Sequence, residues 1–197
     1  MIRNKAEQIF FLEEDRKALS VPKLSFTSRI KEFFFPNQIW RFQKYLRKLE
    51  YYSNASICKP VKWGGKIWYK MRFRKQSLKL GFSIPINVCD YGLSIAHYGT
   101  IVISTNAHIG RYCHIHAGVN IGASAGKPEA PTIGDNVYIG PGAILFGNIR
   151  IANNCTIAAN ATVNKSFDIE RSVIAGTPAK VVKEEYHNWL EFNNIQL

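Results

Sequence analysis

Aliphatic residues recur at every sixth position through the second half of the chain, with small and polar residues between them. The series comprises Ile103, Ile109, Ile115, Ile121, Ile133, Ile139, Leu145, Ile151, Ile157 and Val163, and only Lys127 falls outside it. An α-helix would show a period of about 3.6 and a single strand a period of about 2. A period of six therefore predicts a solenoid of short stacked strands.

A second inward position follows most of these aliphatic residues by four places. It is occupied by Ala107, Cys113, Val119, Val137, Ala143, Ile149, Cys155 and Ala161. Three hexads would make one coil of about 18 residues, with roughly 4.8 Å between coils. Because these side chains fill the interior, we expect any active site on the outside, in a groove between neighbouring copies of the chain.

Residues 123–132 interrupt the hexads. This segment is small, polar and contains two prolines, which predicts an excursion loop that leaves the solenoid. Loops that leave a regular scaffold often carry function. The hexads end after Asn164, a turn is predicted over residues 175–180, and residues 181–192 are predicted to form a terminal helix that closes the open end.

Residues 1–80 contain no hexads and are predicted to be helical. Pro36-Asn37 indicates a helix start before residues 38–53. The apolar face of this helix would be Ile39, Phe42, Leu46 and Leu49. Gly64-Gly65 predicts a break, after which a second helix over residues 66–80 ends at Gly81. Its inward residues would be Ile67, Met71 and Leu78.

The expected fold class is therefore mostly β, with three parts. Residues 81–180 form a parallel β-helix of hexapeptide repeats. Residues 1–80 form a basic N-terminal helical cap, and residues 181–197 form a short C-terminal helix and tail.

Charge divides the chain in the same way as the repeats. The net charge is +12, but residues 1–80 hold 19 Lys/Arg against 6 Asp/Glu, whereas residues 81–197 hold 7 against 8. This asymmetry indicates an anionic partner for the basic region, either a membrane surface or a glycan. The alternative is that its aromatic residues pack the helices onto the solenoid and its charges are solvated. No nucleic-acid-binding motif is present.

Targeting and metal signals are missing from the sequence. No segment resembles a signal peptide or a membrane span. The four cysteines have neither metal-ligand nor disulfide-framework spacing, so we expect free thiols and no bound metal. A cytoplasmic location follows, with the inner face of the membrane as a site of peripheral contact.

Residues 84–183 resemble the hexapeptide-repeat acyltransferases in their hexads, their excursion loop and the closing Ala-Gly-Thr-Pro-Ala-Lys of residues 175–180. The resemblance implies a left-handed β-helix and a homotrimer. It also implies acetyl-CoA as the co-substrate, bound in the groove between two prisms, and transfer of acetyl to a hydroxyl or an amine.

Within that family the chain is most similar to serine acetyltransferases and their polysaccharide-modifying relatives. Residues 93–102, Leu-Ser-Ile-Ala-His-Tyr-Gly-Thr-Ile-Val, resemble the segment that carries the catalytic histidine, which places His97 as the base. A neutral imidazole can take the proton of an attacking alcohol. His116, in a hexad position often given to glycine, is the second candidate. His108 and His114 are expected to be solvated at turns.

The acceptor residues of serine acetyltransferases are not matched. Ala96 and Phe82 stand where those enzymes have aspartates, and Glu129 and Ala130 stand where they have an arginine-histidine pair. Glu129 would repel the carboxylate of an amino acid. These departures favour a sugar hydroxyl as the acceptor.

The resemblance also implies contacts to both substrates. The positions matched to cofactor contacts are Gly140, Pro141, Gly142, Ala159, Asn164, Lys165, Lys180 and Lys183. The positions expected to bind or orient the acceptor are Asp90, Tyr98 and Asn120. Asp90 or a backbone carbonyl would fix the tautomer of His97.

The resulting hypothesis is an acetyl-CoA-dependent O-acetyltransferase of surface polysaccharide biosynthesis, such as that of capsule or O-antigen. Serine O-acetyltransferase is the alternative within the same chemistry. Two further alternatives do not involve acetyl transfer. One is a non-catalytic hexapeptide scaffold, and the other is a metal-bearing β-helix that would use histidine ligands.

Overall fold

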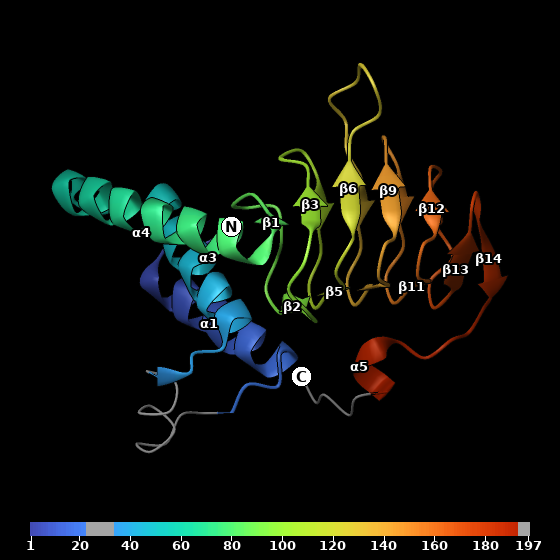
Figure 1. Cartoon of the computed structure of the whole chain (residues 1–197), viewed down its shortest axis with the longest axis horizontal. Coiled ribbons are helices and arrows are strands. Elements are labelled where there is room, and N and C mark those ends of the chain that lie inside the picture. The colour runs from blue at the N-terminus through green and yellow to red at the C-terminus, as the bar shows by residue number, and fades with distance from the viewer. Residues whose placement is uncertain (23–33, 193–197) are drawn as a thin grey trace.

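The computed structural model describes residues 1–22 and 34–192, and it consists of three helices, a β-helix and a short terminal helix (Figure 1). The helices are α1 (Lys5–Ala18), α3 (Gln38–Asn54), α4 (Lys59–Leu80) and α5 (Trp189–Phe192). The strands are β1 (Phe82–Ser83), β2 (Ser94–Ile95), β3 (Ile101–Ile103), β4 (His108–Ile109), β5 (His114–Ile115), β6 (Asn120–Gly122), β7 (Thr132–Ile133), β8 (Tyr138–Ile139), β9 (Ile144–Phe146), β10 (Arg150–Ile151), β11 (Thr156–Ile157), β12 (Thr162–Val163), β13 (Val173–Gly176) and β14 (Ala179–Lys183).

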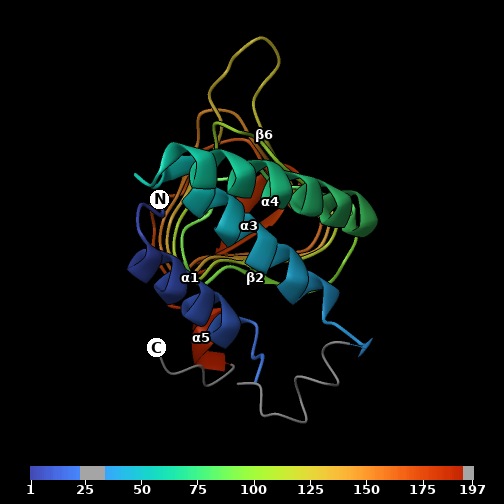
Figure 2. The same ribbon diagram turned by 90° about the vertical axis from the view of Figure 1, so that its left-hand side faces the viewer.

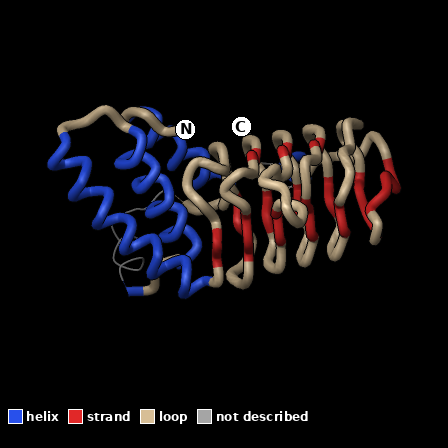
Figure 3. Tube along the Cα trace, turned by 90° about the horizontal axis from the view of Figure 1, so that it is seen from above, coloured by secondary structure: helices blue, strands red, loops and turns tan. Residues whose placement is uncertain are grey.

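The strands form three sheets, one on each side of a prism. Their orders are β1-β3-β6-β9-β12, β10-β7-β4 and β14-β13-β11-β8-β5-β2, and every pairing except β13 with β14 is parallel. Seen from above, the chain passes through them as successive coils (Figure 3). The predicted solenoid is confirmed, and it is a left-handed β-helix.

Strand register confirms the predicted coil length. Ile133 pairs with Ile151 and Ile139 pairs with Ile157, each 18 positions along the chain. Across the excursion loop, Ile109 pairs with Ile133, which is 24 positions along. The loop therefore lengthens its coil by one hexad, and Figure 1 shows it projecting beyond β6.

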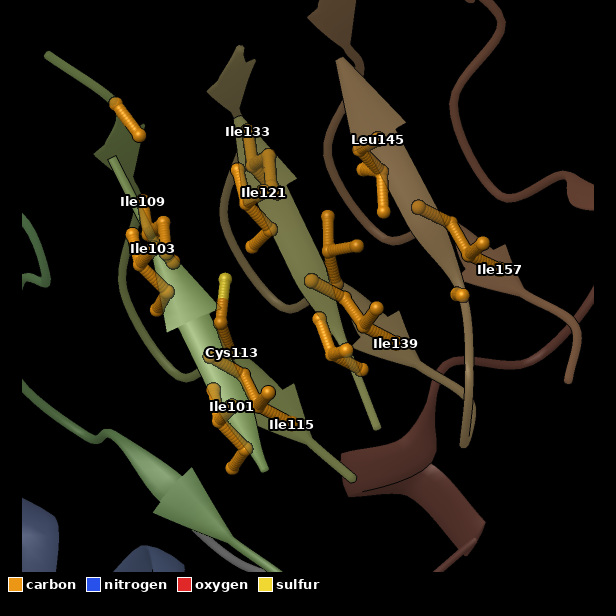
Figure 4. Close-up of a cluster of buried hydrophobic side chains, with 14 of the residues drawn as sticks. Ile101, Ile103, Ile109, Cys113, Ile115, Ile121, Ile133, Ile139, Leu145 and Ile157 are labelled. Carbon is orange, nitrogen blue, oxygen red and sulfur yellow. The ribbon is translucent and has the colours of Figure 1, made fainter. Parts of the chain in front are cut away.

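The aliphatic column fills the prism, as the hexads predicted (Figure 4). Ile109, Ile115, Ile121 and Ile139 have no exposed surface. The second inward position is buried as well, including Cys113 and Cys155, which are free thiols. Along the axis each aliphatic residue stacks on that of the next coil, as Ile133 does on Ile151, so buried side chains fill the interior.

The helical cap shares the core of the β-helix. Phe42 and Leu46 of α3 are fully buried in the same cluster as the coil residues, and the ring centroid of Phe42 lies 5.1 Å from that of Phe82. Figure 2 shows the helices lying across the end of the coils. The α3 start at Asn37 is confirmed, because its side chain accepts hydrogen bonds from the N–H groups of Ile39 and Trp40. The sequence pattern did not predict α1.

Two predictions for α4 were wrong. The helix runs through Gly64-Gly65 instead of breaking there. A side chain at Gly65 would lie 2.3 Å from the ring of Tyr52, so this glycine lets α3 and α4 approach closely. The residues predicted to face inward, Ile67, Met71 and Leu78, are exposed. The predicted end at Gly81 is confirmed, with the left-handed conformation that glycine favours.

The predicted terminal helix over residues 181–192 was also wrong in extent and in place. Residues 181–183 belong to β14, and the described helix is limited to α5. α5 packs against Tyr112 and Ala18 instead of closing the end of the coils, and the indole N–H of Trp189 donates to the carbonyl of Tyr112. The tail over residues 193–197 lies outside the described residues. Of the described helices, none has the length and apolar character that a membrane crossing requires.

Candidate active site

The corner that carries His97 is longer than the corner above it. Ile95 pairs with Ile115, 20 positions along, but Ile103 pairs with Ile121, 18 positions along. The first coil therefore has two additional residues between β2 and β3. This extra length lets His97 and Tyr98 stand out of the coil, and both are exposed.

Three histidines meet beside this corner. The ring centroid of His116 lies 5.8 Å from that of His97 and 4.9 Å from that of His114. Residues 97, 114 and 116 come from neighbouring coils, and the parallel register of β2 and β5 brings them together. No group of three or more His, Cys, Asp or Glu side chains in the described part of the chain is arranged to hold a metal ion.

His114 is packed and hydrogen-bonded, which corrects the expectation that it is solvated. Its Nδ1 lies 2.8 Å from the buried hydroxyl of Ser94. Its ring stacks on that of Tyr138 at 5.4 Å and lies 4.7 Å from that of Trp189. Burial, reinforced by His116 and His97, lowers the pKa of His114 to about 4. His114 is therefore neutral at pH 7, and its ring packs against that of His116.

The same causes act more weakly on His116. Its ring lies 5.1 Å from that of Tyr138. Burial and the nearby His97 lower the pKa of His116 below its usual value. A neutral imidazole can accept a proton, so His116 has the form that a general base needs.

The histidines line a pocket of about 380 Å³. Its other walls are Ala18, Leu19, Ser20, Asn37, Ile39, Ser94, Ile95, Ala96 and Trp189. The pocket therefore joins the end of α1, the start of α3, two coils and α5. The hexad pattern could not predict the walls from α1, α3 and α5, because they come from segments far away in the sequence.

A strip of small residues begins at this corner and continues along the coils. It is formed by Ala117, Gly118, Pro141, Gly142 and Ala159. Gly142 donates its N–H to the carbonyl of Ala117, and Asn160 donates its N–H to the carbonyl of Pro141, so the corners are stacked in register. A side chain at Gly118 would lie 3.1 Å from the backbone nitrogen of Gly142. The strip is a shallow track of backbone that leads away from the histidines.

This strip contains three of the predicted cofactor positions, Pro141, Gly142 and Ala159, and a fourth, Gly140, directly precedes Pro141. The structure thus brings the predicted base and half of the predicted cofactor contacts to one edge of the prism. Gly140 is buried against the next coil, where a side chain would lie 2.7 Å from the nitrogen of Ala159.

The other predicted cofactor positions are spread more widely. Lys180 and Lys183 lie on β14. In the turn that precedes β14, the hydroxyl of Thr177 donates to the carbonyl of Asn160, which directly follows Ala159 of the strip. Asn164 and Lys165 follow β12, at the opposite edge of its sheet. Within one chain these two residues do not join the strip.

The three predicted acceptor positions do not gather. Tyr98 is exposed beside His97. Asp90 lines a different pocket together with His108, and its carboxylate accepts from the N–H of Tyr91. Asn120 lies on the exposed side of β6. Asp90 is therefore not placed to fix the tautomer of His97.

The residues that depart from the serine acetyltransferase pattern have clear positions. Phe82 is part of the core, in contact with Phe42. Ala96 lines the histidine pocket. Glu129 is exposed on the excursion loop and Ala130 is buried at its base.

Residues 130–165 match the family described as bacterial transferase hexapeptide (six repeats). Over these residues the repeat region of this chain is similar to that family. A serine acetyltransferase of Synechococcus elongatus is 36% identical over 94 residues, which cover 46% of this chain and 38% of the relative. One from Staphylococcus epidermidis is 38% identical over 96 residues, which cover 47% and 44%. The match thus spans less than half the length of these relatives.

Solved structures extend the likeness in fold to the helical cap. A serine acetyltransferase from Brucella abortus superposes with a TM-score of 0.62 at 21% identity, over 91% of this chain and 70% of that chain. A soybean serine acetyltransferase in complex with serine gives a TM-score of 0.64 at 18% identity, over 90% and 70%. The hexapeptide domain and its cap therefore share one architecture with these enzymes.

Proposed function

We propose that this protein is an acetyl-CoA-dependent O-acetyltransferase that moves an acetyl group from a thioester to a hydroxyl. The observation that supports this most directly is the edge at which the rings of His97 and His116 face a pocket and the strip of small residues begins. A base beside a pocket suits an alcohol acceptor. A track of backbone suits the extended pantetheine arm of coenzyme A.

The chemistry needs one neutral imidazole. The base takes the proton of the acceptor hydroxyl while the hydroxyl oxygen attacks the thioester carbon. The carbon–sulfur bond then breaks, and the proton passes from the imidazolium to the leaving thiolate. We assign His97 as the base because it stands at the exposed tip of the corner. His116 is the second candidate, and cationic forms of the two rings oppose each other.

The cofactor would lie along Pro141, Gly142 and Ala159, with its phosphates toward Lys180 and Lys183. Asn164 and Lys165 would then serve a neighbouring chain, since they occupy the opposite edge of the sheet. This division supports a homotrimer in which each groove lies between two prisms. Three flat sides suit such packing.

Two acceptors are proposed. L-serine is the first, because the curated relatives that match the hexapeptide domain are serine acetyltransferases. A sugar hydroxyl of a surface polysaccharide is the second. Two residues favour this acceptor. Phe82, which stands where serine acetyltransferases have an aspartate, is buried in the core. The carboxylate of Glu129 would repel the carboxylate of an amino acid.

Thiol release from acetyl-CoA tests the proposal. Purified protein is assayed with L-serine and with a panel of sugars and glycans, as wild type and as His97→Ala, His116→Ala and the control His108→Ala. We expect release that depends on the acceptor, loss of about 10²-fold or more for His97→Ala, and wild-type rates for His108→Ala. Wild-type turnover by His97→Ala would remove His97 as the base. No release by the wild type, with any acceptor, would favour the scaffold alternative.

A further inference from the structure

Helix α4 turns an apolar stripe toward solvent. Trp63, Ile67, Met71 and Leu78 are 71%, 40%, 58% and 76% exposed, respectively. Their spacing of four, four and seven residues places them on one side of the helix. The opposite side packs on the molecule through Phe73, Gln76 and Leu80. Three of the four, Ile67, Met71 and Leu78, are the residues predicted to face inward, so this is an amphipathic face that the described part of the chain leaves uncovered.

Positive charge flanks this stripe. α4 carries eight Lys/Arg and no Asp/Glu in its 22 residues. Lys66, Lys70 and Arg74 follow one edge of the stripe at intervals of four. Lys75 and Lys79 follow the other edge. A helix with an apolar face, exposed tryptophan and basic borders has the composition of a helix that lies in a bilayer interface.

An apolar hollow of about 550 Å³ opens between α3, α4 and β1. Its walls include Leu49, Phe73, Phe82, Ile84, Pro85 and Ile86, and Lys66, Lys70, Arg74 and Leu78 stand along its border with the stripe. The hydroxyls of Ser53 and Ser77 in its wall are buried and have no hydrogen-bond partner within the described residues. Apolar walls, a cationic border and unpaired hydroxyls suit a chain with an anionic head.

We propose that α4 docks this protein on an anionic lipid bilayer. The stripe enters the boundary between headgroups and acyl chains, the flanking cations meet lipid phosphates, and the hollow receives part of one acyl chain. Charge argues for lipid over a second copy, because two such regions, each with 19 Lys/Arg against 6 Asp/Glu, would repel each other. A soluble anionic glycan would engage the cations but leave the stripe exposed.

The membrane contact is independent of acetyl transfer, so its test uses no acetyl-CoA. Full-length protein is sedimented with vesicles of phosphatidylglycerol and phosphatidylcholine, and with phosphatidylcholine alone, at low salt and at about 0.5 M salt. We expect binding to the anionic vesicles only, weakened by salt. Tryptophan emission should shift to the blue, because Trp63 and Trp68 are exposed in the free protein.

Variants separate the stripe from charge in general. Combined Trp63→Ser, Ile67→Ser and Met71→Ser should reduce vesicle binding at least about tenfold, because three buried apolar side chains are lost. The matched control is Ile169→Ser with Val182→Ser, two exposed aliphatic residues of the hexapeptide domain, which should bind as the wild type does. Circular dichroism checks that both variants fold.

Three results would overturn the proposal. The first is no binding of the wild type to anionic vesicles. The second is unchanged binding by the stripe variant together with competition by dextran sulfate, which would assign the charges to a glycan. The third is a lower oligomeric mass of the stripe variant by light scattering, which would make the stripe an interface between copies.

Discussion

Arg47 and Asp15 form an ion pair with no exposed side-chain surface, in which Nε of Arg47 lies 2.8 Å from Oδ2 of Asp15. Arg47 also donates to Glu50 at 3.0 Å and to the carbonyls of Cys89 and Asp90. Asp15 in turn accepts from a backbone N–H of the first coil. One guanidinium therefore joins α1, α3 and the β-helix, and it fixes the cap that supplies walls to the histidine pocket.

Removing one partner of this pair should be costly. Arg47→Ala leaves the Asp15 carboxylate buried and unpaired, so we expect the free energy of unfolding to fall by about 3–5 kcal/mol in urea titrations. The exposed pair between Arg150 and Asp168 provides the control, and Arg150→Ala should have little effect. Equal effects of the two substitutions would show that the buried pair does not hold the cap.

Acid should destabilise the protein through His114. Its pKa is lowered to about 4, below the usual 6.5, so the unfolded chain binds a proton that the folded chain does not. Stability is then fully present above pH 6.5 and falls by about 3 kcal/mol as pH drops to 4. His114→Gln should flatten this part of the pH profile of urea unfolding, whereas His108→Gln, at an exposed histidine, should leave it unchanged.

The two adjacent glycines of α4 should respond in opposite ways. Gly64 has open space around it, so Gly64→Ala should stabilise the protein by about 0.5–1 kcal/mol through helix propensity. Gly65→Ala should destabilise it, because the new methyl group would meet the ring of Tyr52. Thermal unfolding of both variants measures the difference. A stable Gly65→Ala would mean that α3 and α4 are not in close contact there.

A bulky residue on the strip should affect the cofactor before it affects the fold. Ala159 is exposed, so Ala159→Phe can be accommodated while it obstructs the track. We expect the KM for acetyl-CoA to rise by about tenfold or more, the loss of roughly 1.4 kcal/mol of binding. Thr105→Phe, at an exposed turn on another corner, is the control. An unchanged KM for acetyl-CoA would show that the cofactor does not bind along this strip.

The coils could be predicted from the sequence because their signal is local. Each hexad repeats the same inward residue, so Ile133 and Ile151 predict one another without any knowledge of the rest of the molecule. The left hand of the coil came only from the family resemblance. The prediction of which face of α4 is buried was wrong for a related reason. Periodicity shows that Ile67 and Met71 share a face of the helix, but it does not show whether that face points to the core or to solvent.

The site was harder to predict than the fold. His97 and His116 could be proposed from their segments, and they do lie together. The surroundings of His114 could not, because Trp189 reaches it from 75 positions away. Asp90 looked suitable as a neighbour of His97 because only seven positions separate them. The coil turns a corner between them, however, and Asp90 faces another pocket.

The position of Trp189 determines when, during synthesis of the chain, the histidine pocket can form. The walls of the histidine pocket come from residues near 18, 37, 96 and 116, and the last wall comes from residue 189. During translation the coils and all three histidines therefore emerge before their pocket can close. A nascent chain would carry these imidazoles in an open groove. The pocket would be complete only once Trp189 is in place, with its indole N–H donating to the carbonyl of Tyr112.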